Sequence, residues 1–470
     1  MASQIKLGTD GWRALIGEEF TLANVERVAG AFVAHLRDRR RAGRKVVIGF
    51  DTRFLSPEAA EAAAETVRSA GIDVILADRP TPTPALSYAV VSNHASGGIV
   101  ITASHNPCRW NGVKFKADYG GSVSIGIARE IEKRLAQKSA KALRRAGKSG
   151  SIERRDLVTP YLENVKRMVD LDSIRSSGLR FALDPMFGAG RGCLARIFSE
   201  AGIPSMEIHG EHNPLFPGLN PEPIEPHVEA LRSAVLEGGY DAGFATDGDA
   251  DRIGAMDRSG AFVDSHKIFS ILLVHLVVDR KKTGEVIKTF SSTDWIDRLG
   301  RRYGLKVHTT RIGFKYICAL MLTRNVLMAG EESGGLAMGG QLPERDGILN
   351  ALLLAEVMAE RGKLLSGLIE EIAAAVGRLE YKRMDLEMDR AAAQRIIREV
   401  GQSKHLKIGG LTATTVEILD GAKLRFGDAG WILFRASGTE NLLRLYAEFP
   451  AKSEVRRMLD AMAEFARSRS

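Results

Sequence analysis

The chain has 470 residues, of which 44% are hydrophobic and 26% are charged, so we expect about three or four globular domains. Its apolar runs are far shorter than the ~20 residues that cross a bilayer, and residues 1–10 lack the apolar segment of a secretion signal. Three scattered cysteines exclude a disulfide scaffold, and we expect a cytoplasmic protein with no membrane contact.

The net charge of +8 gives little support to nucleic-acid binding. The basic clusters at residues 37–45 and 133–148 contain no aromatic side chain that could stack on a base. We interpret them as solvated helix ends, where cations complement the helix dipole, and predict no nucleic-acid partner. A positive field would attract a small anionic substrate.

In chain order, strand and helix patterns alternate through the first three quarters of the sequence. Apolar, β-rich segments predict strands at residues 45–50, 71–77, 98–102, 179–183, 241–246, 284–289, 306–309 and 326–329. Helices are predicted at residues 57–70, which are rich in alanine, and at residues 125–145. The pattern restarts twice, which predicts three similar α/β domains with mixed, mostly parallel sheets.

The C-terminal part differs because its predicted strands follow one another closely. Strand patterns occur at residues 411–419, 422–426, 431–435 and 441–448, and a basic helix is predicted at residues 453–467. This arrangement is typical of an α+β domain. With a break at residues 148–151, the predicted domains are residues 1–150, 151–253, 254–376 and 377–470.

The strongest local signal is the acidic segment at residues 247–252 (DGDADR), directly after a predicted strand. Asp247, Asp249 and Asp251 alternate with small residues, so a curled loop could direct three carboxylates at one hard cation such as Mg²⁺ or Ca²⁺. An EF-hand is excluded because arginines occupy its sixth and twelfth positions. Crowded carboxylates repel one another unless a cation or Arg252 compensates, which disfavours a plain solvated turn.

A second signal is the segment at residues 102–107 (TASHNP), at the end of another predicted strand. Ser104 lies where chemistry is usually found in parallel sheets, and His105 adds a polar group without an apolar pattern around it. Taken alone, a capping serine is the more common explanation. The segment does not match the nucleophile elbow G-x-S-x-G, and Lys114 supplies a cation ten residues further on.

Two further loops carry polar groups among glycines. Residues 330–335 (GEESGG) present Glu331 and Ser333, which suit recognition of a vicinal diol, although an ordinary βα loop is an equal alternative. Residues 435–440 (RASGTE) suit a phosphate cradle, again with an ordinary loop as an equal alternative. The glycine-rich segment at residues 188–192 departs from the dinucleotide motif G-x-G-x-x-G, so we do not favour a nucleotide site.

Together with residues 8–13 (GTDGWR), these four motifs resemble those of the α-D-phosphohexomutase superfamily, which includes phosphoglucomutases, phosphomannomutases and phosphoglucosamine mutases. The five motifs occur in the family's order from residue 8 to residue 440, so the resemblance covers nearly the whole chain. It implies four domains around a central cleft, each contributing one loop. It also implies an isomerase that interconverts hexose 1-phosphate and hexose 6-phosphate through a phosphoserine and a bound 1,6-bisphosphate.

The resemblance implies roles for individual residues. Ser104 would donate and accept the phosphoryl group, and Mg²⁺ would be held by the three aspartates and by an oxygen of the phosphorylated Ser104. Arg13, Lys114 and Arg252 would surround the transferring group. Lys114 is favoured as general acid and base, with His105 as the other candidate. The substrate would be bound by Glu331, Ser333, Lys315, Arg435, Ser437, Gly438 and Thr439.

The resemblance favours glucose as the sugar. Lys315, in its Gly-Phe-Lys setting, is similar to a loop of the phosphoglucomutase branch, and Gly335 stands where the other two branches usually place histidine. The expected activator is glucose 1,6-bisphosphate, and the expected partner is a small sugar phosphate bound by a monomer or homodimer. Phosphomannomutase or dual glucose and mannose specificity is the alternative. A non-catalytic sugar-phosphate sensor is much less favoured, because Ser104 and all three aspartates are present.

Overall fold

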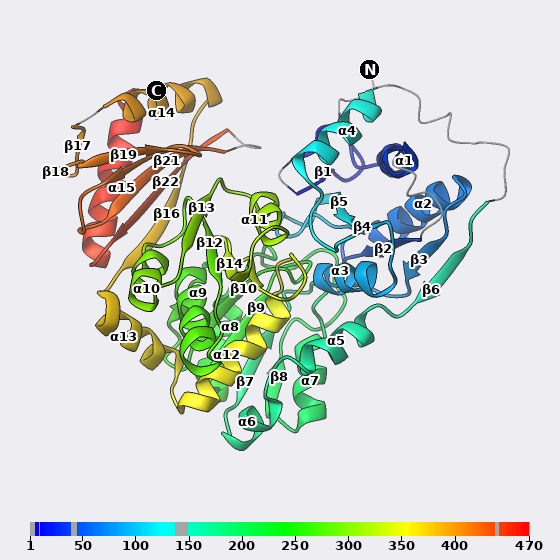
Figure 1. Ribbon diagram of the computed structural model, residues 1–470, viewed down its shortest axis with the longest axis horizontal. Helices are drawn as coiled ribbons and strands as arrows, with labels where there is room; N and C mark the ends of the chain where they lie inside the picture. Colours follow the sequence, from blue (N-terminus) through cyan, green and yellow to red (C-terminus); the bar gives the residue numbers. More distant parts are fainter. Residues whose placement is uncertain are drawn as a thin grey trace. The chain divides into compact units, whose positions relative to one another are not determined.

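The computed structural model describes residues 5–8, 10–38, 45–136, 149–403, 405–437 and 441–469 (Figure 1). The chain forms two compact units, Met1–Glu285 with Gly313–Leu368 and Val286–Ile312 with Ile369–Ser470. It therefore passes from one unit to the other three times. None of the helices in the described ranges has the length and apolar character that a bilayer requires.

The first unit begins with a six-stranded mixed sheet. Its strands, in spatial order, are β1 (Trp12–Leu15), β5 (Trp110–Ala117), β4 (Gly97–Ile101), β2 (Val46–Phe50), β3 (Val74–Ala77) and β6 (Ile152–Arg155). The strands from β4 to β6 are parallel, whereas β5 is antiparallel to both of its neighbours. Apolar side chains of β2, β3 and β4 form much of the core of this domain.

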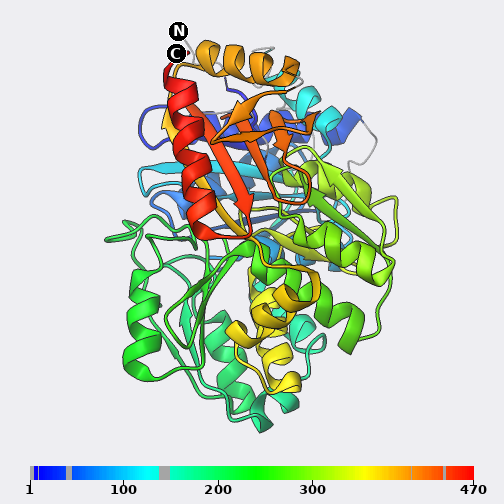
Figure 2. The same ribbon diagram turned by 90° about the vertical axis from the view of Figure 1, so that its left-hand side faces the viewer.

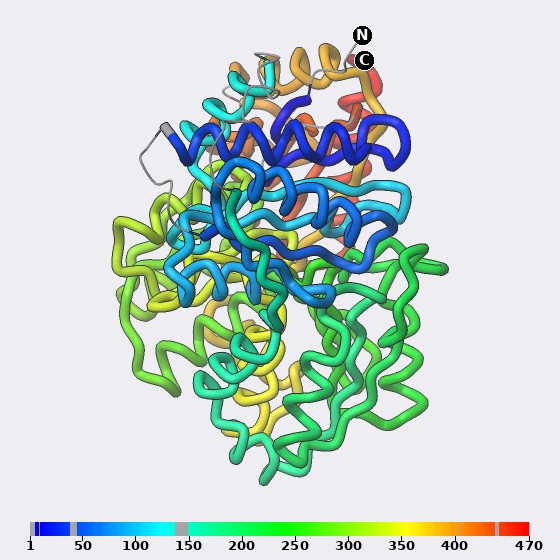
Figure 3. Tube along the Cα trace, turned by 90° about the vertical axis from the view of Figure 1, so that its right-hand side faces the viewer, coloured from blue at the N-terminus to red at the C-terminus, as the bar shows by residue number. Residues whose placement is uncertain are grey.

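Within the described residues, the helices of this first domain are α1 (Leu22–Asp38), α2 (Ser56–Ser69), α3 (Thr83–Ser92) and α4 (Ile125–Ala136). The tube in Figure 3 shows α1 and α2 side by side, and the small buried alanines of α2 permit this close packing. Residues 39–44 and 137–148 lie outside the described residues, and they include most of both basic clusters and the end of the predicted helix. β6 follows the predicted limit at residue 150 and pairs with β3, so the first sheet continues past that limit.

The second domain has a five-stranded sheet. Its spatial order is β11 (Phe262–Val263), β10 (Ile253–Asp257), β9 (Ala242–Thr246), β7 (Phe181–Asp184) and β8 (Ser205–Glu207). Its helices are α5 (Val158–Lys166), α6 (Leu171–Ser176), α7 (Cys193–Ala201) and α8 (Glu229–Gly238). The strands from β9 to β8 are parallel, and those from β9 to β11 are antiparallel. The predicted limit at residue 253 falls on the first residue of β10.

The third domain is divided between the two units. The first unit holds α9 (Ser265–Val274), the π-helical turn His275–Asp279, α11 (Phe314–Met321), the antiparallel strands β14 (Val326–Gly330) and β15 (Leu336–Met338), and α12 (Gly347–Arg361). The second unit holds nearly all of the parallel strands β12 (Glu285–Thr289) and β13 (Val307–Thr310), and α10 (Trp295–Tyr303). After α12, α13 (Leu365–Val376) leads into the C-terminal domain.

The C-terminal domain is an antiparallel sheet with two helices on one face (Figure 2). The sheet order is β16 (Glu380–Glu387), β22 (Leu442–Phe449), β21 (Trp431–Ala436), β20 (Ala422–Arg425) and β19 (Thr415–Ile418). The remaining elements are α14 (Arg390–Gln402), β17 (Lys407–Ile408), β18 (Leu411–Thr412) and α15 (Lys452–Arg467). Alternate residues of β21 face opposite sides, so Trp431 and Leu433 pack away from the helices, against Phe290 after β12.

These elements confirm the predicted class, three α/β domains with mixed sheets followed by an α+β domain. β16 and α14 were not predicted, because both are rich in charged residues and largely half-buried or exposed. The three predicted limits between the domains and the cleft shared by all four stay predictions.

Because of Asp346, the N-cap of α12, we expect the stability of the folded protein to depend on pH. Its carboxylate accepts hydrogen bonds from the Leu349 amide at 2.9 Å and from the Tyr161 hydroxyl of α5 at 2.7 Å. Burial raises the pKa of Asp346 to about 7, whereas this carboxyl has a pKa of ~3.9 in the unfolded chain. The folded state thus binds the proton more tightly. The free energy of unfolding should therefore fall between about pH 4 and about pH 7, by up to ~1.4 kcal/mol per pH unit from this group.

Asp346→Asn removes this titration while keeping a good helix cap. In urea unfolding, the variant should lose less stability than the unmutated protein between about pH 4 and about pH 7. Asp170→Asn, at the exposed N-cap of α6, is the matched control and should retain the full loss. Equal losses in Asp346→Asn and the unmutated protein would contradict the assignment.

Candidate active site

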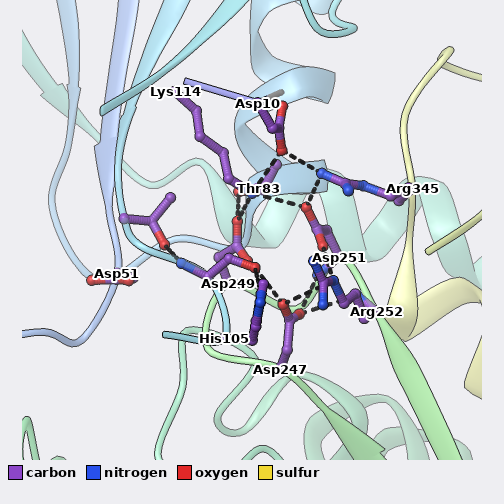
Figure 4. Close-up of polar contacts among 12 residues, drawn as sticks. Asp10, Asp51, Thr83, His105, Lys114, Asp247, Asp249, Asp251, Arg252 and Arg345 are labelled. Carbon is purple, nitrogen blue, oxygen red and sulfur yellow. Dashed lines mark hydrogen bonds and ion pairs between the residues drawn. The ribbon is translucent and has the colours of Figure 1, made fainter. Parts of the chain in front are cut away.

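Polar loops from three α/β domains meet within the first unit (Figure 4). The first domain contributes the Ser104 loop (residues 102–110) after β4, Lys114 on β5 and Asp10 before β1. The second contributes the acidic loop, residues 247–252, which turns β9 into the antiparallel β10. The third contributes Arg345, directly before the N-cap of α12. Hydrogen bonds and ion pairs join these segments into one buried network.

Ser104 is buried and its hydroxyl faces the acidic loop. The residue has a φ of +54°, which is rare outside glycine, and its amide donates to Thr102 Oγ1 at 2.8 Å. Ser104 Oγ donates to Asp247 Oδ2 at 2.7 Å, and His105 Nδ1 lies 3.4 Å from the same serine oxygen. The hydroxyl therefore bonds a distant carboxylate rather than serving as a local helix cap.

The three aspartates of the acidic loop are fully buried, and each offers a carboxylate oxygen within 4.8 Å of the others. Ala250 has a φ of +57°, which curls the loop, and Asp247 Oδ1 accepts the Asp251 amide at 3.0 Å. Asp249 Oδ1 and Asp251 Oδ1 have no hydrogen-bond partner among the described residues. Buried oxygens without donors fit a divalent cation, because hard cations are coordinated by carboxylate oxygens.

Lys114 is a buried cation in direct contact with two of these carboxylates. Its Nζ lies 2.7 Å from Asp249 Oδ2 and 3.0 Å from Asp251 Oδ2. A third carboxylate, that of Asp10, lies at 3.2 Å. Burial would lower the pKa of Lys114, but Asp249 and Asp251 hold it above its ordinary value. The side chain is therefore an ammonium that neutralises part of the acidic loop.

The carboxylates of the acidic loop do not have equal environments. Burial, Asp251 and Asp249 raise the pKa of Asp247 well above its usual range. Burial also acts to raise the pKa of Asp249, but Lys114 holds it below the ordinary value. Arg252 compensates at longer range, with Nε 3.8 Å from Asp247 Oδ2. The raised pKa of Asp247 means that Arg252 and Lys114 do not fully offset the effects of burial and of the two neighbouring carboxylates on this residue.

Two further predicted residues border the Ser104 loop. Arg13 Nη1 donates to Asn106 Oδ1 at 2.6 Å, which places its guanidinium beside the loop. Burial and the nearby charges of Arg252 and Arg13 lower the pKa of His105 well below its usual range. His105 therefore carries a neutral imidazole.

Arg345 is a member of the network that the sequence motifs did not indicate. Its Nη2 donates to Asp10 Oδ2 at 2.5 Å and to Asp251 Oδ2 at 2.6 Å, and Nη1 donates to Glu331 Oε2 at 3.3 Å. A Cβ added at Gly335 would lie 2.2 Å from Arg345 Cδ, so Arg345 occupies the space of a side chain there. Thr83 was missed as well, and its Oγ1 donates to Asp249 Oδ2 at 2.5 Å.

The predicted sugar-binding residues divide into two groups. Glu331 is buried in the network, since Oε1 accepts the Gly313 amide at 3.0 Å and Oε2 accepts from Arg345. Ser333 and Lys315 are half-buried, and Lys315 Nζ lies 5.6 Å from the ring centre of Tyr316. Among the contacts described, neither one reaches the Ser104 loop or the acidic loop.

The predicted phosphate-binding loop belongs to the second unit and is described there only in part. Arg435, on β21, has Nε 3.4 Å from Asp420 Oδ2, and the Ser437 amide donates to the Leu442 carbonyl at 2.9 Å. Gly438 and Thr439 lie outside the described residues.

The glycine-rich segment at residues 188–192 packs beneath the acidic loop. The Ala189 amide donates to the Gly248 carbonyl at 2.9 Å, and a Cβ at Gly188 would lie 2.8 Å from the same oxygen. These glycines permit a close backbone approach, which accounts for the segment without a nucleotide.

Comparisons with known protein families give matches in every domain. The profiles described as Phosphoglucomutase/phosphomannomutase alpha/beta/alpha domains I, II and III match residues 4–142, 159–260 and 264–376, respectively. The profile of the C-terminal domain of the same family matches residues 382–465.

Individual relatives are similar along almost the whole chain. The chain is 32% identical over 456 residues to the phosphoglucomutase/phosphomannomutase of Thermococcus kodakarensis, with 96% of each chain covered. It is 31% identical over 472 residues to the phosphoglucosamine mutase of Marinobacter nauticus, with 98% of each covered. A crystal structure from Thermus thermophilus, provisionally described as a phosphomannomutase, has 36% identity and a TM-score of 0.87 over 99% of this chain and 100% of that chain.

Single carboxylates of the acidic loop should be required for binding of a divalent cation. Because a cation bound only to the folded state stabilises it, by ~2.7 kcal/mol at 100 times Kd, excess Mg²⁺ should raise the Tm of the unmutated protein. Asp249→Asn and Asp251→Asn should each abolish most of this rise, since each removes one of the uncompensated oxygens. Asp241→Asn, just before β9, is the control and should respond to Mg²⁺ normally. An undiminished response in both loop variants would rule out this site.

Proposed function

This chain belongs to the phosphoglucomutase/phosphomannomutase family and is a phosphomutase, and we propose that it interconverts glucose 1-phosphate and glucose 6-phosphate. In this proposal Ser104 carries the transferred phosphoryl group, and glucose 1,6-bisphosphate is the intermediate and activator.

The position of Ser104 Oγ carries the proposal. This oxygen lies 2.7 Å from Asp247 Oδ2, in a buried site shared with two more carboxylates and with Lys114. A phosphoryl group here would be surrounded by fixed charges with water largely excluded, where electrostatic stabilisation is strong. Phosphoryl transfer depends chiefly on positioning and on charge stabilisation, so this arrangement suits it.

The acidic loop would hold the metal, which we propose to be Mg²⁺. Asp247, Asp249 and Asp251 would be its ligands, together with an oxygen of the phosphorylated Ser104. When bound, Mg²⁺ supplies charge stabilisation to the phosphoryl oxygens and to the serine oxygen as it leaves. Three carboxylates form a hard oxygen donor set, which suits this ion better than a thiophilic one.

The cations around the loop would stabilise the phosphoryl oxygens. Arg13 and Arg252 present guanidinium groups that match phosphate geometry. Lys114 is the favoured general acid and base: its ammonium is directed into the acidic loop and can serve as the acid, and it must first lose its proton to serve as the base. His105, whose Nδ1 lies 3.4 Å from Ser104 Oγ, is the alternative.

The sugar would be recognised mainly by Glu331, with Ser333 and Lys315. Gly335 supports glucose, because Arg345 fills the space in which the other two branches usually carry histidine. Phosphomannomutase or dual specificity is the alternative, favoured by relatives named for mannose and glucosamine phosphates. The phosphate at the far end of the sugar would be held by Arg435, Ser437, Gly438 and Thr439.

We further propose a cytoplasmic monomer or homodimer that acts on a small sugar phosphate, with no nucleic-acid or membrane partner. If the protein were instead a non-catalytic sugar-phosphate sensor, it would bind the sugar phosphate without turning it over. The intact set of Ser104, three aspartates and surrounding cations supports the enzyme.

Ser104→Ala should abolish phosphoenzyme formation. After incubation with glucose 1,6-bisphosphate, intact-mass measurement should show one added phosphoryl group on the unmutated protein and none on the variant. The kcat of the variant should fall by about 10³-fold or more, because the phosphoryl group has no acceptor. Ser69→Ala, on the outer side of α2, is the matched control and should behave as the unmutated protein. Equal turnover in Ser104→Ala would refute the phosphoserine.

The sugar preference is tested with three substrates side by side. The kcat/KM for glucose 1-phosphate should exceed those for mannose 1-phosphate and glucosamine 1-phosphate by about tenfold or more, as expected for a difference of one ring substituent. Equal values for glucose and mannose would establish dual specificity instead.

A further inference from the structure

We infer that Arg53, which lies outside every motif, is a positioning residue that holds the Ser104 loop in its reactive conformation. The inference rests on the proposed role of Ser104 as phosphoryl carrier. It concerns a side chain that need not touch the substrate and acts entirely through the backbone of this loop.

The guanidinium of Arg53 donates four hydrogen bonds to main-chain carbonyls of the Ser104 loop. Nη2 donates to the carbonyls of Ser104 and Asn106, both at 2.6 Å. Nη1 donates to the carbonyls of Pro107 at 2.9 Å and Trp110 at 3.1 Å. One side chain thus binds main-chain carbonyls along the whole loop, from Ser104 to Trp110 at the start of β5.

Arg53 is itself fixed in place by contacts on the side away from the Ser104 loop. It is only 1% exposed, and its Nε lies 3.2 Å from Asp51 Oδ2. The other carboxylate oxygen of Asp51 accepts the Arg53 amide at 2.9 Å and the Ser56 hydroxyl at 2.7 Å. The ring of Phe216 lies 5.0 Å from the guanidinium carbon. The two terminal nitrogens are therefore directed at the loop before any substrate arrives.

The loop needs this support because its backbone is strained at the reacting residue. Ser104 has a φ of +54°, a conformation that persists in a non-glycine residue only where surrounding contacts enforce it. The same carbonyl that Arg53 binds also touches the acidic loop, since a Cβ at Gly248 would lie 2.4 Å from it. Arg53 thereby sets the separation between the two loops, on which the contact of Ser104 Oγ with Asp247 depends.

The shape of the side chain matters here as well as its charge. A guanidinium presents its donors in a rigid planar fork, whereas a lysine presents three donors from one atom. A lysine at position 53 would keep the positive charge beside Asp51 and could not reach four carbonyls at once.

Arg53→Lys is the central test. The kcat of the variant should fall by about 100-fold, as expected for a displacement of the reacting oxygen by about 1 Å. The KM for glucose 1-phosphate should stay within about threefold, because the substrate contacts are intact. The rate of Ser104 phosphorylation by glucose 1,6-bisphosphate should fall as much as kcat, and the rise in Tm with Mg²⁺ should be retained.

Ser56→Ala is the matched control. It removes the hydrogen bonds of Ser56 Oγ to the same Asp51 and to Asn111 of β5, and none to the Ser104 loop, so it should lower Tm and leave kcat unchanged. An unchanged kcat in Arg53→Lys would overturn the inference. A fall in kcat matched by equal changes in KM and in the Mg²⁺ response would overturn it too, because this marks a general loss of structure.

If Arg53→Lys does not fold, Asp51→Asn decides the question. This variant leaves the fork in place without its charged anchor, so kcat should fall with KM retained, and an unchanged kcat would reject the inference. Absence of phosphate on Ser104 in the unmutated protein would reject the phosphoserine and this inference together. Normal phosphorylation of both the unmutated protein and Arg53→Lys would reject the inference alone.

Discussion

The candidate site depends on a balance of charge among buried side chains from different domains. Three carboxylates lie within one short hairpin loop, and they can be buried together only because cations from elsewhere approach them. Lys114 comes from β5 of the first domain and Arg345 from the start of α12. Asp10 binds both of these cations, so no single ion pair forms alone. The site is therefore complete only where the segments that carry these side chains pack together in the first unit.

Much of the fold could be predicted because parallel strands are buried on both faces and appear as continuous apolar runs. The strands β2, β4 and β9 are of this kind. The antiparallel strand β5 (WNGVKFKA) was not predicted, since its sequence reads as polar. Its Lys114 and Lys116 are nevertheless fully buried, because each is paired with carboxylates from distant parts of the chain. Such pairing is a property of the tertiary structure, and no local pattern reports it.

The site itself was predictable where chemistry is concentrated in a short segment. The acidic loop was identified from its spacing, and the Ser104 loop from its place after a strand and from the family resemblance. The structure brings Ser104 Oγ and Asp247 into contact. Residues that act singly had no such signal. Arg345 stands in an unremarkable RDG sequence, and Arg53 bonds only to backbone carbonyls on the loop side, which leave no trace in the identities of the loop residues. Arg345 and Arg53 can be recognised only in the structure, which shows that both side chains are buried and which groups their guanidinium nitrogens bind.

The second unit draws on two separate stretches of chain, and this limits how it can be isolated. Phe290, from the middle of the sequence, covers the aromatic side of the C-terminal sheet at Trp431 and Tyr446. A fragment cut out at residue 377 would expose this apolar patch to water and would tend to self-associate. An independent C-terminal fragment would have to carry residues 286–312 with it, joined by an artificial linker or by circular permutation.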